Sequence, residues 1–344
     1  MAITKINIAD FTVFKNFCLE PSPGINVLIG ENGTGKTHLL KLMYAAALAR
    51  DEKMDKFVNV FEVIGNTSFK IKNIVDGVVR TDQPFDAAVL NREITHAESS
   101  REPPRNYLGK ESPIHRNYEI IVESDNAYDP LFIPAKEMPS LAKFTNVANQ
   151  FKKAMSPDPT LFEIVERGRN ENPDDLTPLA EKIIPRLEEI IDGTVFINPI
   201  DQTFWVRKHN GAEIPFSMES EGIRKFALFW KLIMNHNLKS GDVLLWDEPE
   251  ANISLKLIPD LVKIIFELVR NNVQVFIATH DYSLAKYLEI RCEEGDILKY
   301  HSLAKEQNGV AVETCDNFRE LKQNVIMSSL DILMDEIVTG NMGD

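Results

Sequence analysis

The feature that most constrains this chain is the segment Gly30-Glu31-Asn32-Gly33-Thr34-Gly35-Lys36-Thr37, which matches G-x-x-x-x-G-K-[ST] at every fixed position. An apolar run, residues 25–29, precedes it and is typical of a strand buried on both faces of a parallel sheet. A helical stretch, residues 38–50, follows it. A strand, a glycine-rich loop and a helix in this order form a phosphate site, because the loop N–H groups and the helix N-terminus face one point.

The residue types in this loop assign separate roles. Lys36 is expected to reach the β- and γ-phosphates of a nucleotide and to assist catalysis, and the Thr37 hydroxyl is expected to bind Mg²⁺. The rest of the predicted nucleotide-binding segment consists of Gly30, Glu31, Asn32, Gly33, Thr34, Gly35 and His38. A chance glycine-rich turn is the alternative, and the strand and helix on either side disfavour it.

Two adjacent acids end a second apolar strand, residues 243–246. Asp247 can hold Mg²⁺, and Glu248 can polarise an attacking water as a general base. Taken alone, the segment is more typical of a solvated acidic turn after a core strand. Together with the phosphate loop, it predicts a metal and water site for hydrolysis.

A third strand, residues 274–278, is followed by Thr279-His280-Asp281. His280 can form a hydrogen bond to a γ-phosphate or to the attacking water, although a histidine at a strand end is often a surface residue. Because the carboxyl ends of parallel strands meet at one edge of a sheet, we expect His280 to lie near the acid pair.

Residues 221–236 read as an amphipathic helix with Ser220 as its N-cap. One interpretation is a capped helix that serves only the core. The other is a second anion site, formed by the Ser220 hydroxyl and the N–H of Gly222 at the positive end of the helix dipole.

Charge and composition narrow the class of protein. The 344 residues carry a net charge of −14, so diffuse binding to DNA or to an anionic membrane is not expected. No apolar run approaches the roughly 18 residues that span a bilayer, and no secretory signal is visible. The odd number of cysteines, three, disfavours a disulfide framework. We expect a soluble cytoplasmic protein.

The order of elements predicts an α/β fold, because helices and strands alternate from residue 221 onward. We expect four segments: 1–135 with the phosphate loop and a β lobe, 136–215 as a helical subdomain, 216–300 with the second half of the site, and 301–344 as a strand and an amphipathic helix. That last helix is expected to pack on its own head, with partner docking as the weaker alternative.

The order of the phosphate loop, the Ser220-x-Gly222 helix, Trp246-Asp247-Glu248-Pro249 and Thr279-His280-Asp281 resembles the heads of ABC-type ATPases. The branch it is most similar to holds RecF, the SMC-like proteins, the overcoming-lysogenisation-defect (OLD) ATPases and the short prokaryotic "AAA family ATPase" proteins. The similarity covers about residues 3–300.

The resemblance implies a P-loop NTPase fold: an ABC-type ATPase head with a mostly parallel core sheet, an antiparallel β lobe and a helical subdomain. It also implies a head-to-head homodimer that holds two ATP-Mg²⁺ between its subunits. Ser220 and Gly222 would contact the γ-phosphate bound by the partner copy, and Phe14, Lys15 and Asn16 would lie near the base and ribose. The glutamine usual in such heads is absent: Ile133-Pro134-Ala135-Lys136-Glu137 occupies its expected place after a strand but carries no glutamine.

The resemblance leaves three functions open. In the first, a slow, partner-regulated ATPase drives a separate effector, such as a nuclease or toxin, in prokaryotic anti-phage defence. We expect no Toprim nuclease domain in this chain. The second is a RecF-like DNA-repair ATPase, for which the basic residues Arg101, Arg105, Lys110 and Arg116 would bind DNA. The third is a scaffold that dimerises on ATP with negligible turnover.

Overall fold

The computed structural model describes residues 3–50, 67–86, 116–137, 139–142 and 159–340. Its centre is a six-stranded sheet of order β14-β13-β3-β12-β11-β7. Neighbouring strands are parallel except for the β13–β14 pair. The strands are β3 (Ile25–Gly30), β7 (Pro130–Ile133), β11 (Val243–Asp247), β12 (Gln274–Ala278), β13 (Leu298–Glu306) and β14 (Gly309–Cys315). Arg101, Arg105 and Lys110 of the predicted basic loop lie outside the described residues.

The central strands separate two hydrophobic cores because their side chains alternate between the two faces. Leu28, Leu245 and Phe276 belong to one core. Their neighbours in the strands, such as Val27 and Trp246, belong to the other. All six residues of β3 are buried, so the apolar run that precedes the phosphate loop is buried on both sides.

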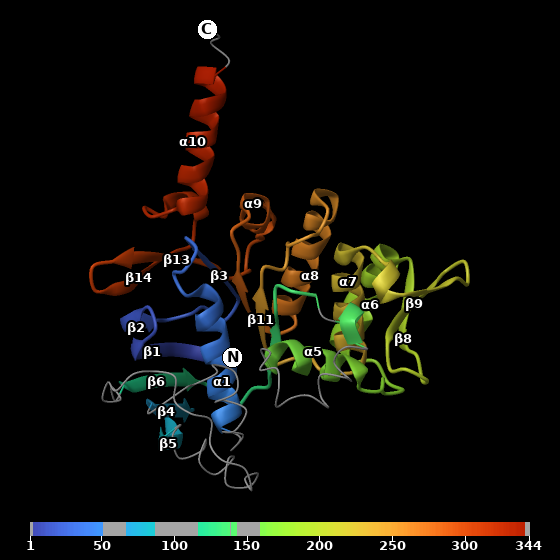
Figure 1. Ribbon diagram of the computed structural model, residues 1–344, viewed down its shortest axis with the longest axis horizontal. Helices are drawn as coiled ribbons and strands as arrows, with labels where there is room; N and C mark the ends of the chain where they lie inside the picture. The colour runs from blue at the N-terminus through green and yellow to red at the C-terminus, as the bar shows by residue number, and fades with distance from the viewer. Residues whose placement is uncertain (1–2, 51–66, 87–115, 138, 143–158, 341–344) are drawn as a thin grey trace, which may run out of the picture.

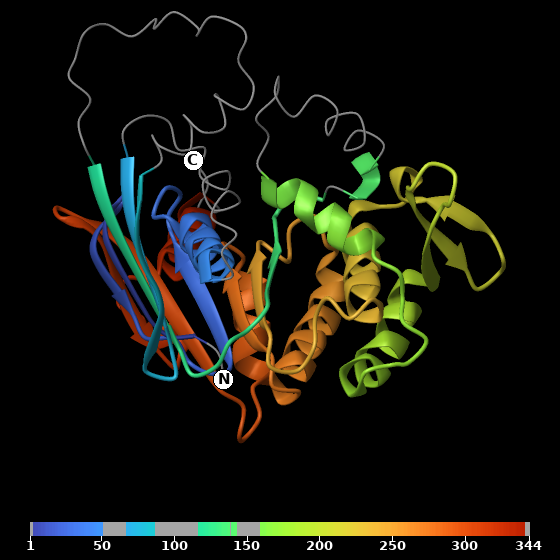
Figure 2. The ribbon, with the colours of Figure 1, turned by 90° about the horizontal axis from the view of Figure 1, so that it is seen from below.

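The first core lies between the central sheet, helix α1 (Lys36–Arg50) and a five-stranded sheet of order β2-β1-β6-β4-β5. Figure 2 shows α1 beside these outer strands. The outer sheet is antiparallel apart from the parallel pair β4–β6. Its strands are β1 (Ile3–Phe11), β2 (Phe14–Leu19), β4 (Thr67–Val75), β5 (Val78–Asp86) and β6 (Arg116–Ser124).

The second core is covered by helices, which lie around α7 on the right of the central sheet in Figure 1. The helices are α5 (Pro159–Arg169), α6 (Pro178–Ile191), α7 (Glu221–Met234), α8 (Ile258–Arg270) and α9 (Tyr282–Arg291). A small antiparallel sheet flanks them: β8 (Gly193–Ile197), β9 (Phe204–Lys208) and β10 (Glu213–Pro215). Short 3-10 turns are η1 (Pro139–Leu141), η2 (Phe216–Met218), η3 (Leu255–Leu257) and η4 (Phe318–Glu320).

Helix α7 is buried around more of its circumference than its sequence predicts. Phe226, Trp230 and Ile233 form the buried apolar side expected of an amphipathic helix, but Lys225, Leu228 and Lys231 on other sides of α7 are buried too. The reason is that α5, α6 and β8 all contact α7. The two lysines find backbone acceptors: Glu248 O for Lys225 and Asn170 O for Lys231.

The C-terminal helix α10 (Val325–Gly340) does not pack on its own head, so that expectation is wrong. It stands away from the body at the top of Figure 1. Leu321 and Ile326 join the core, but every residue from 331 to 340 is exposed. Only the first turn of the helix meets the sheet, because the helix axis points away from it. In the part of the chain that the structure describes, no helix has the length and apolar character needed to cross a bilayer.

Candidate nucleotide-binding site

The glycine-rich loop leaves β3 at its carboxyl end and turns directly into α1. Gly30, Gly33 and Gly35 have φ values of +148°, +77° and +91°, which side chains rarely tolerate. A Cβ on Gly30 would lie 2.4 Å from the carbonyl oxygen of Leu303. The Thr34 hydroxyl donates to Glu31 O at 2.9 Å and closes the loop, while Glu31, Asn32 and Gly33 are exposed.

Lys36 lies inside this loop. Its Nζ donates to Gly30 O at 2.7 Å and to Glu31 O at 3.1 Å. Burial lowers the pKa of Lys36 to about 8, although the nearby Asp247 and Glu248 oppose that shift. A buried ammonium held only by carbonyl oxygens is a place where an anion is strongly favoured, and phosphate is the anion that loops of this kind bind.

Thr37 and Asp247 converge although 210 residues separate them. The Thr37 hydroxyl donates to Asp247 Oδ2 at 3.0 Å and to Oδ1 at 3.1 Å. Burial raises the pKa of Asp247 to about 6, so it is a carboxylate at neutral pH. A hydroxyl and a carboxylate at one point are the oxygen ligands that Mg²⁺ prefers, so the two residues fit that ion.

Glu248 and His280 lie at the same edge of the sheet. Glu248 has a backbone φ of +45°, in the left-handed region, and its N–H donates to Ala278 O at 2.9 Å. His280 Nε2 is 3.8 Å from Glu248 Oε1, and both side chains are about 40% exposed. Burial, together with Lys36, lowers the pKa of His280, so its imidazole is neutral at pH 7. A carboxylate and a neutral imidazole therefore face solvent beside Lys36.

The start of α7 contacts another part of the chain. Ser220 is the exposed N-cap residue, but its hydroxyl makes no capping hydrogen bond. A Cβ on Gly222 would lie 2.9 Å from Asn252 O, so α7 begins against the loop that follows the acid pair. No hydrogen bond described here joins Ser220 or Gly222 to residues 30–37 of the same copy. The structure therefore brings the phosphate loop and the acids together, and leaves Ser220 apart from them.

The residues predicted to lie near a base are divided by burial. Phe14 is fully buried, 4.7 Å from Phe17 between ring centroids, and a Cβ on Gly35 would meet its ring at 2.6 Å. Phe14 therefore packs against the phosphate loop, and its expected place near the base and ribose stays a prediction. Lys15 and Asn16 are exposed. His38 is also exposed, and its Nδ1 is 3.5 Å from the Thr12 hydroxyl.

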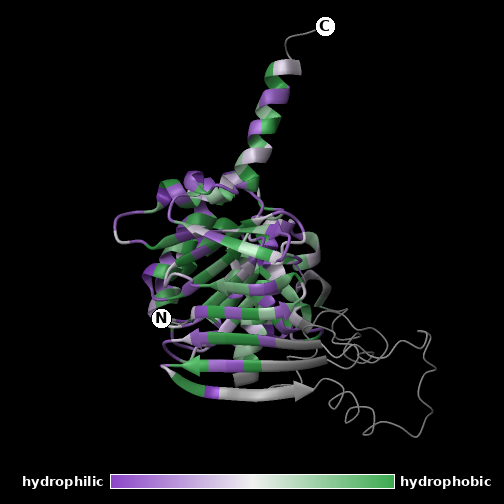
Figure 3. Ribbon diagram, turned by 90° about the vertical axis from the view of Figure 1, so that its left-hand side faces the viewer, coloured by the Kyte–Doolittle hydropathy of each residue, from purple (hydrophilic) through white to green (hydrophobic). Residues whose placement is uncertain are grey.

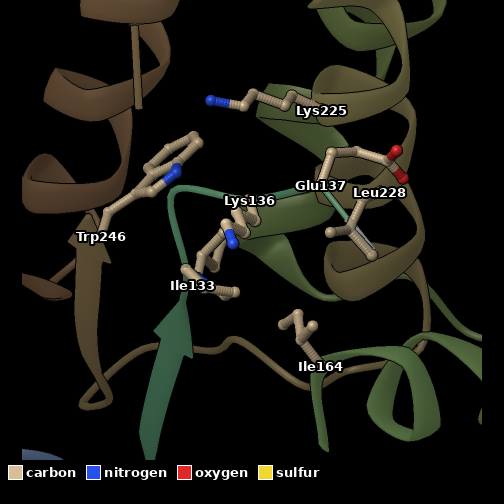
Figure 4. Close-up of a pocket in the computed structure, with 8 residues that line it drawn as sticks. Ile133, Lys136, Glu137, Ile164, Lys225, Leu228 and Trp246 are labelled. Atoms are coloured by element: carbon tan, nitrogen blue, oxygen red, sulfur yellow. The ribbon is translucent and has the colours of Figure 1, made fainter. Parts of the chain in front are cut away.

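A buried charged cluster behind the site was not predicted. Glu137 stands where the glutamine was expected; its carboxylate is 1% exposed, and Arg224 Nε on α7 lies 3.2 Å from its Oε2. Burial raises the pKa of Glu137, and hydrogen bonding with Ser140, followed by the charge of Arg224, opposes that shift. The next residue, Lys225, donates to Glu248 O at 3.1 Å. Figure 4 shows Glu137, Lys225 and Trp246 around one small pocket. The lysine in the helix and the missing glutamine were the only sequence signals.

Two further contacts at this edge were also missed. The Thr279 hydroxyl donates to Glu250 Oε1 at 2.5 Å, and burial raises the pKa of Glu250 to about 7. Lys305 Nζ, on β13, donates to Asn32 O at 3.2 Å. Lys305 is thus a second cation beside the phosphate loop, and only the pairing of β13 with β3 brings it there.

The fold and the site define a P-loop ATPase of the ABC type. The chain belongs to the family described as "AAA domain, putative AbiEii toxin, Type IV TA system", whose model matches residues 80–286.

Curated relatives include DNA replication and repair proteins RecF. The protein from Idiomarina loihiensis is 35% identical over 71 residues, which are 21% of this chain and 20% of the relative. The one from Shewanella putrefaciens is 42% identical over 113 residues, 29% of this chain and 31% of the relative. The chain therefore aligns with less than a third of the length of these relatives.

Solved structures with a similar arrangement include an SMC head bound to the C-winged helix domain of ScpA, at 13% identity and a TM-score of 0.47, covering 93% of this chain and 99% of that one. The SMC head domain from Thermotoga maritima has 13% identity and a TM-score of 0.41, with coverage of 92% and 100%.

Proposed function

We propose that this chain binds ATP-Mg²⁺ at residues 30–37 and hydrolyses it, that two copies close head to head around the nucleotide, and that this cycle regulates a partner effector protein. The observation that carries the proposal is the hydrogen bond between Thr37 and Asp247 beside the buried Lys36. Two distant parts of the sequence, the adjacent Lys36 and Thr37 and the remote Asp247, thus meet at one point, and their chemistry suits a triphosphate and a divalent cation.

Each side chain has a proposed task. Lys36 exchanges the carbonyls of its own loop for phosphate oxygens and compensates their charge. Glu248 orients a water and accepts its proton, and His280 donates a hydrogen bond to the terminal phosphate. When bound, Mg²⁺ supplies charge compensation for the phosphates, held by Thr37 and Asp247. The Glu248 carboxylate lies beside His280 at this edge, with 3.8 Å between His280 Nε2 and Glu248 Oε1.

The proposed dimer rests on what is exposed near the start of α7. The Ser220 hydroxyl makes no capping hydrogen bond. Two large apolar residues on the segments that meet at Gly222 are exposed: Met218 at 78% and Leu255 at 67%. Large apolar side chains around an exposed hydroxyl are typical of a surface that another protein covers. A second copy would bring its phosphate loop to Ser220 and Gly222.

The decisive experiment combines two variants. Glu248→Gln keeps the shape of the side chain but removes the base, so ATP should bind, turnover should fall by about 10²–10⁴, and a dimer should accumulate in size-exclusion chromatography with ATP. Adding Ser220→Arg should return that dimer to monomer while ATP still binds, because the bulky cation blocks the surface. A monomeric Glu248→Gln protein with bound ATP would contradict the sandwich; turnover unaffected by Glu248→Gln would contradict the hydrolytic role.

The proposed effector is a separate polypeptide, a nuclease or toxin of a defence system. The family description, which names a toxin and a Type IV toxin–antitoxin system, supports it. Purification of the tagged chain with its neighbouring genes, with and without Lys36→Ala, tests it. A nuclease or toxin should co-purify in a stoichiometric ratio with at least one nucleotide state, and its absence from both would contradict the proposal.

A second candidate is direct DNA binding, which the names of the RecF relatives favour. It predicts binding to duplex DNA that weakens steeply with salt and is lost when Arg101, Arg105, Lys110 and Arg116 are neutralised together. Binding unaffected by those changes would contradict this alternative.

A further inference from the structure

Lys225, in the second turn of α7, places a positive charge in the interior of the protein. The residue is only 7% exposed. Hydrophilic side chains usually face solvent, and Figure 3 shows hydrophilic and hydrophobic positions alternating along the strands of the outer sheet, which has one face in a core. Burial of an ammonium lowers stability unless it is hydrogen-bonded and close to opposite charges. The partners of Lys225 should therefore show what its position achieves.

The hydrogen-bond partner of Lys225 is the main chain of Glu248. Figure 4 shows the lysine extending from α7 toward the side of the sheet that carries Trp246. Its Nζ donates to Glu248 O at 3.1 Å, and the Ala251 N–H donates to the same oxygen at 3.1 Å. Two donors on this carbonyl restrict rotation of the peptide group next to the Glu248 Cα, where φ is +45°. The charged donor makes the stronger of the two bonds. Lys225 therefore restrains the backbone that carries the Glu248 carboxylate.

The charges around Lys225 favour the protonated form that can donate this bond. Burial lowers the pKa of the lysine, and nearby carboxylates oppose that shift. In order of decreasing effect, the carboxylates are Glu250, Glu221, Glu248 and Glu137. A neutral side chain at position 225 would leave these acids without this cation, and it would remove the bond to Glu248 O.

Lys231, the other buried lysine of α7, provides a comparison. It is 4% exposed, and its Nζ donates to Asn170 O at 2.9 Å. Burial lowers the pKa of both lysines. The two differ in the backbone that they hold. Lys231 binds the end of the segment that follows α5, away from the proposed nucleotide site, whereas Lys225 binds the residue that we propose as the general base. A role in hydrolysis is therefore expected only for Lys225.

We propose that Lys225 is a positioning residue for ATP hydrolysis: its ammonium holds the main chain of Glu248 so that the carboxylate stays beside His280. This inference rests on the proposed function, because it assumes that Glu248 accepts a proton from the attacking water. Lys225 makes no hydrogen bond to residues 30–37 in the part of the chain that the structure describes. It should therefore affect the chemical step and not the binding of ATP.

Steady-state kinetics of Lys225→Met tests the inference. Methionine keeps much of the apolar stem but cannot donate, so kcat should fall about tenfold or more while ATP affinity stays within about threefold. Lys225→Arg keeps a charged donor and should recover part of the loss. Lys225→Gln, whose polar end is shorter, gives the same comparison if Lys225→Met does not fold.

The matched control is Lys231→Met, which removes an equally buried ammonium from the same helix. It should lower the melting temperature about as much as Lys225→Met does, and leave kcat within about twofold. Equal losses of kcat in the two methionine variants would make Lys225 a structural residue and overturn the inference. An unchanged kcat in Lys225→Met would overturn it as well.

A double-mutant cycle with Glu248→Gln separates this inference from the proposed function. If Lys225 acts through the Glu248 carboxylate, adding Lys225→Met to Glu248→Gln should lower the residual turnover by less than about twofold. A further loss as large as that of Lys225→Met alone would overturn the positioning role and leave the proposed base intact. Normal turnover of the Glu248→Gln protein would contradict the proposed function itself, and with it this inference.

Discussion

The phosphate-loop edge and the start of α7 differ in how much of a site one copy of the chain completes. At the edge, Lys36, Thr37 and Asp247 are buried or half-buried and already bonded to one another or to the loop. At the start of α7, Ser220 is exposed and its hydroxyl caps nothing. At the phosphate-loop edge, the charged groups are buried and have partners within one copy. At the start of α7, the Ser220 hydroxyl is exposed to solvent.

This difference between the two regions shows which contacts follow from the fold of one copy. Parallel pairing of β3, β12 and β11 brings their carboxyl ends together, so the phosphate-loop edge follows from the sheet. The start of α7 is fixed in place by the ion pair between Arg224 and Glu137 and by the close packing of Gly222 on the backbone of Asn252. Its exposed groups gain partners only from outside the copy. The next four predictions test this contrast, from the largest expected effect to the smallest.

Lys36→Ala should weaken ATP binding by two to three powers of ten, because about 3–4 kcal/mol of charge-assisted hydrogen bonds to phosphate is lost. Isothermal titration calorimetry measures it. Lys305→Ala, which removes the second cation beside the loop, is the control and should cost less than tenfold. Unchanged affinity of Lys36→Ala would mean that the phosphate-loop edge is not the nucleotide site.

Arg224→Ala should lower the free energy of unfolding by about 2–3 kcal/mol, because Glu137 would stay buried without a countercharge. Adding Glu137→Gln should recover part of the loss, since an amide needs no counter-ion. Urea unfolding of the two variants measures both. ATP affinity should stay within a few-fold. A loss of ATP binding equal to that of Lys36→Ala would show the two regions to be one unit.

Asp247→Asn should stabilise the nucleotide-free protein by about 1–2 kcal/mol at pH 7.5, because burial of the carboxylate is unfavourable. The pKa of Asp247 is raised from 3.8 to about 6, so the cost of its charge is absent below pH 3.8 and complete above pH 6. The gain should therefore disappear on acidification to about pH 4. Thermal unfolding at the two pH values measures it, and a gain that persists at the lower pH would contradict the cause.

Ser220→Ala should reduce turnover about tenfold, roughly one hydrogen bond to a developing charge, and leave both ATP affinity and stability nearly unchanged. Ser217→Ala, on an exposed residue of the preceding turn, is the matched control. Steady-state turnover at saturating ATP measures both. A drop in melting temperature without a drop in turnover would make Ser220 a structural cap and remove the contrast between the two regions.

The sequence predicted what adjacent residues determine. The apolar runs before Gly30 and Asp247 are fully buried strands, and Thr37 and Asp247 meet because parallel strands share an edge. Side-chain roles that depend on packing were harder. Phe14 was expected near a base, and the structure shows its ring fully buried against Gly35 of the phosphate loop. Nothing local distinguishes a ring that supports a loop from one that faces a ligand.

The same reason explains the error at α10. The spacing of its apolar residues predicts an amphipathic helix, and the structure contains that helix. The spacing does not show whether the apolar side packs on the same chain. The pairing of Glu137 with Arg224 was equally invisible, because 87 residues separate the two and neither belongs to a motif. Long-range contacts of charged side chains need the whole fold to be specified.

Glu248 is held with φ at +45°, a conformation that glycine would accept without strain and that costs a glutamate of order 1 kcal/mol. Natural drift toward stability would therefore favour glycine or asparagine at this position. A glutamate is retained there only if the role of its carboxylate outweighs this loss of stability. An alignment of homologous sequences should therefore show a glutamate at position 248 if the carboxylate is needed.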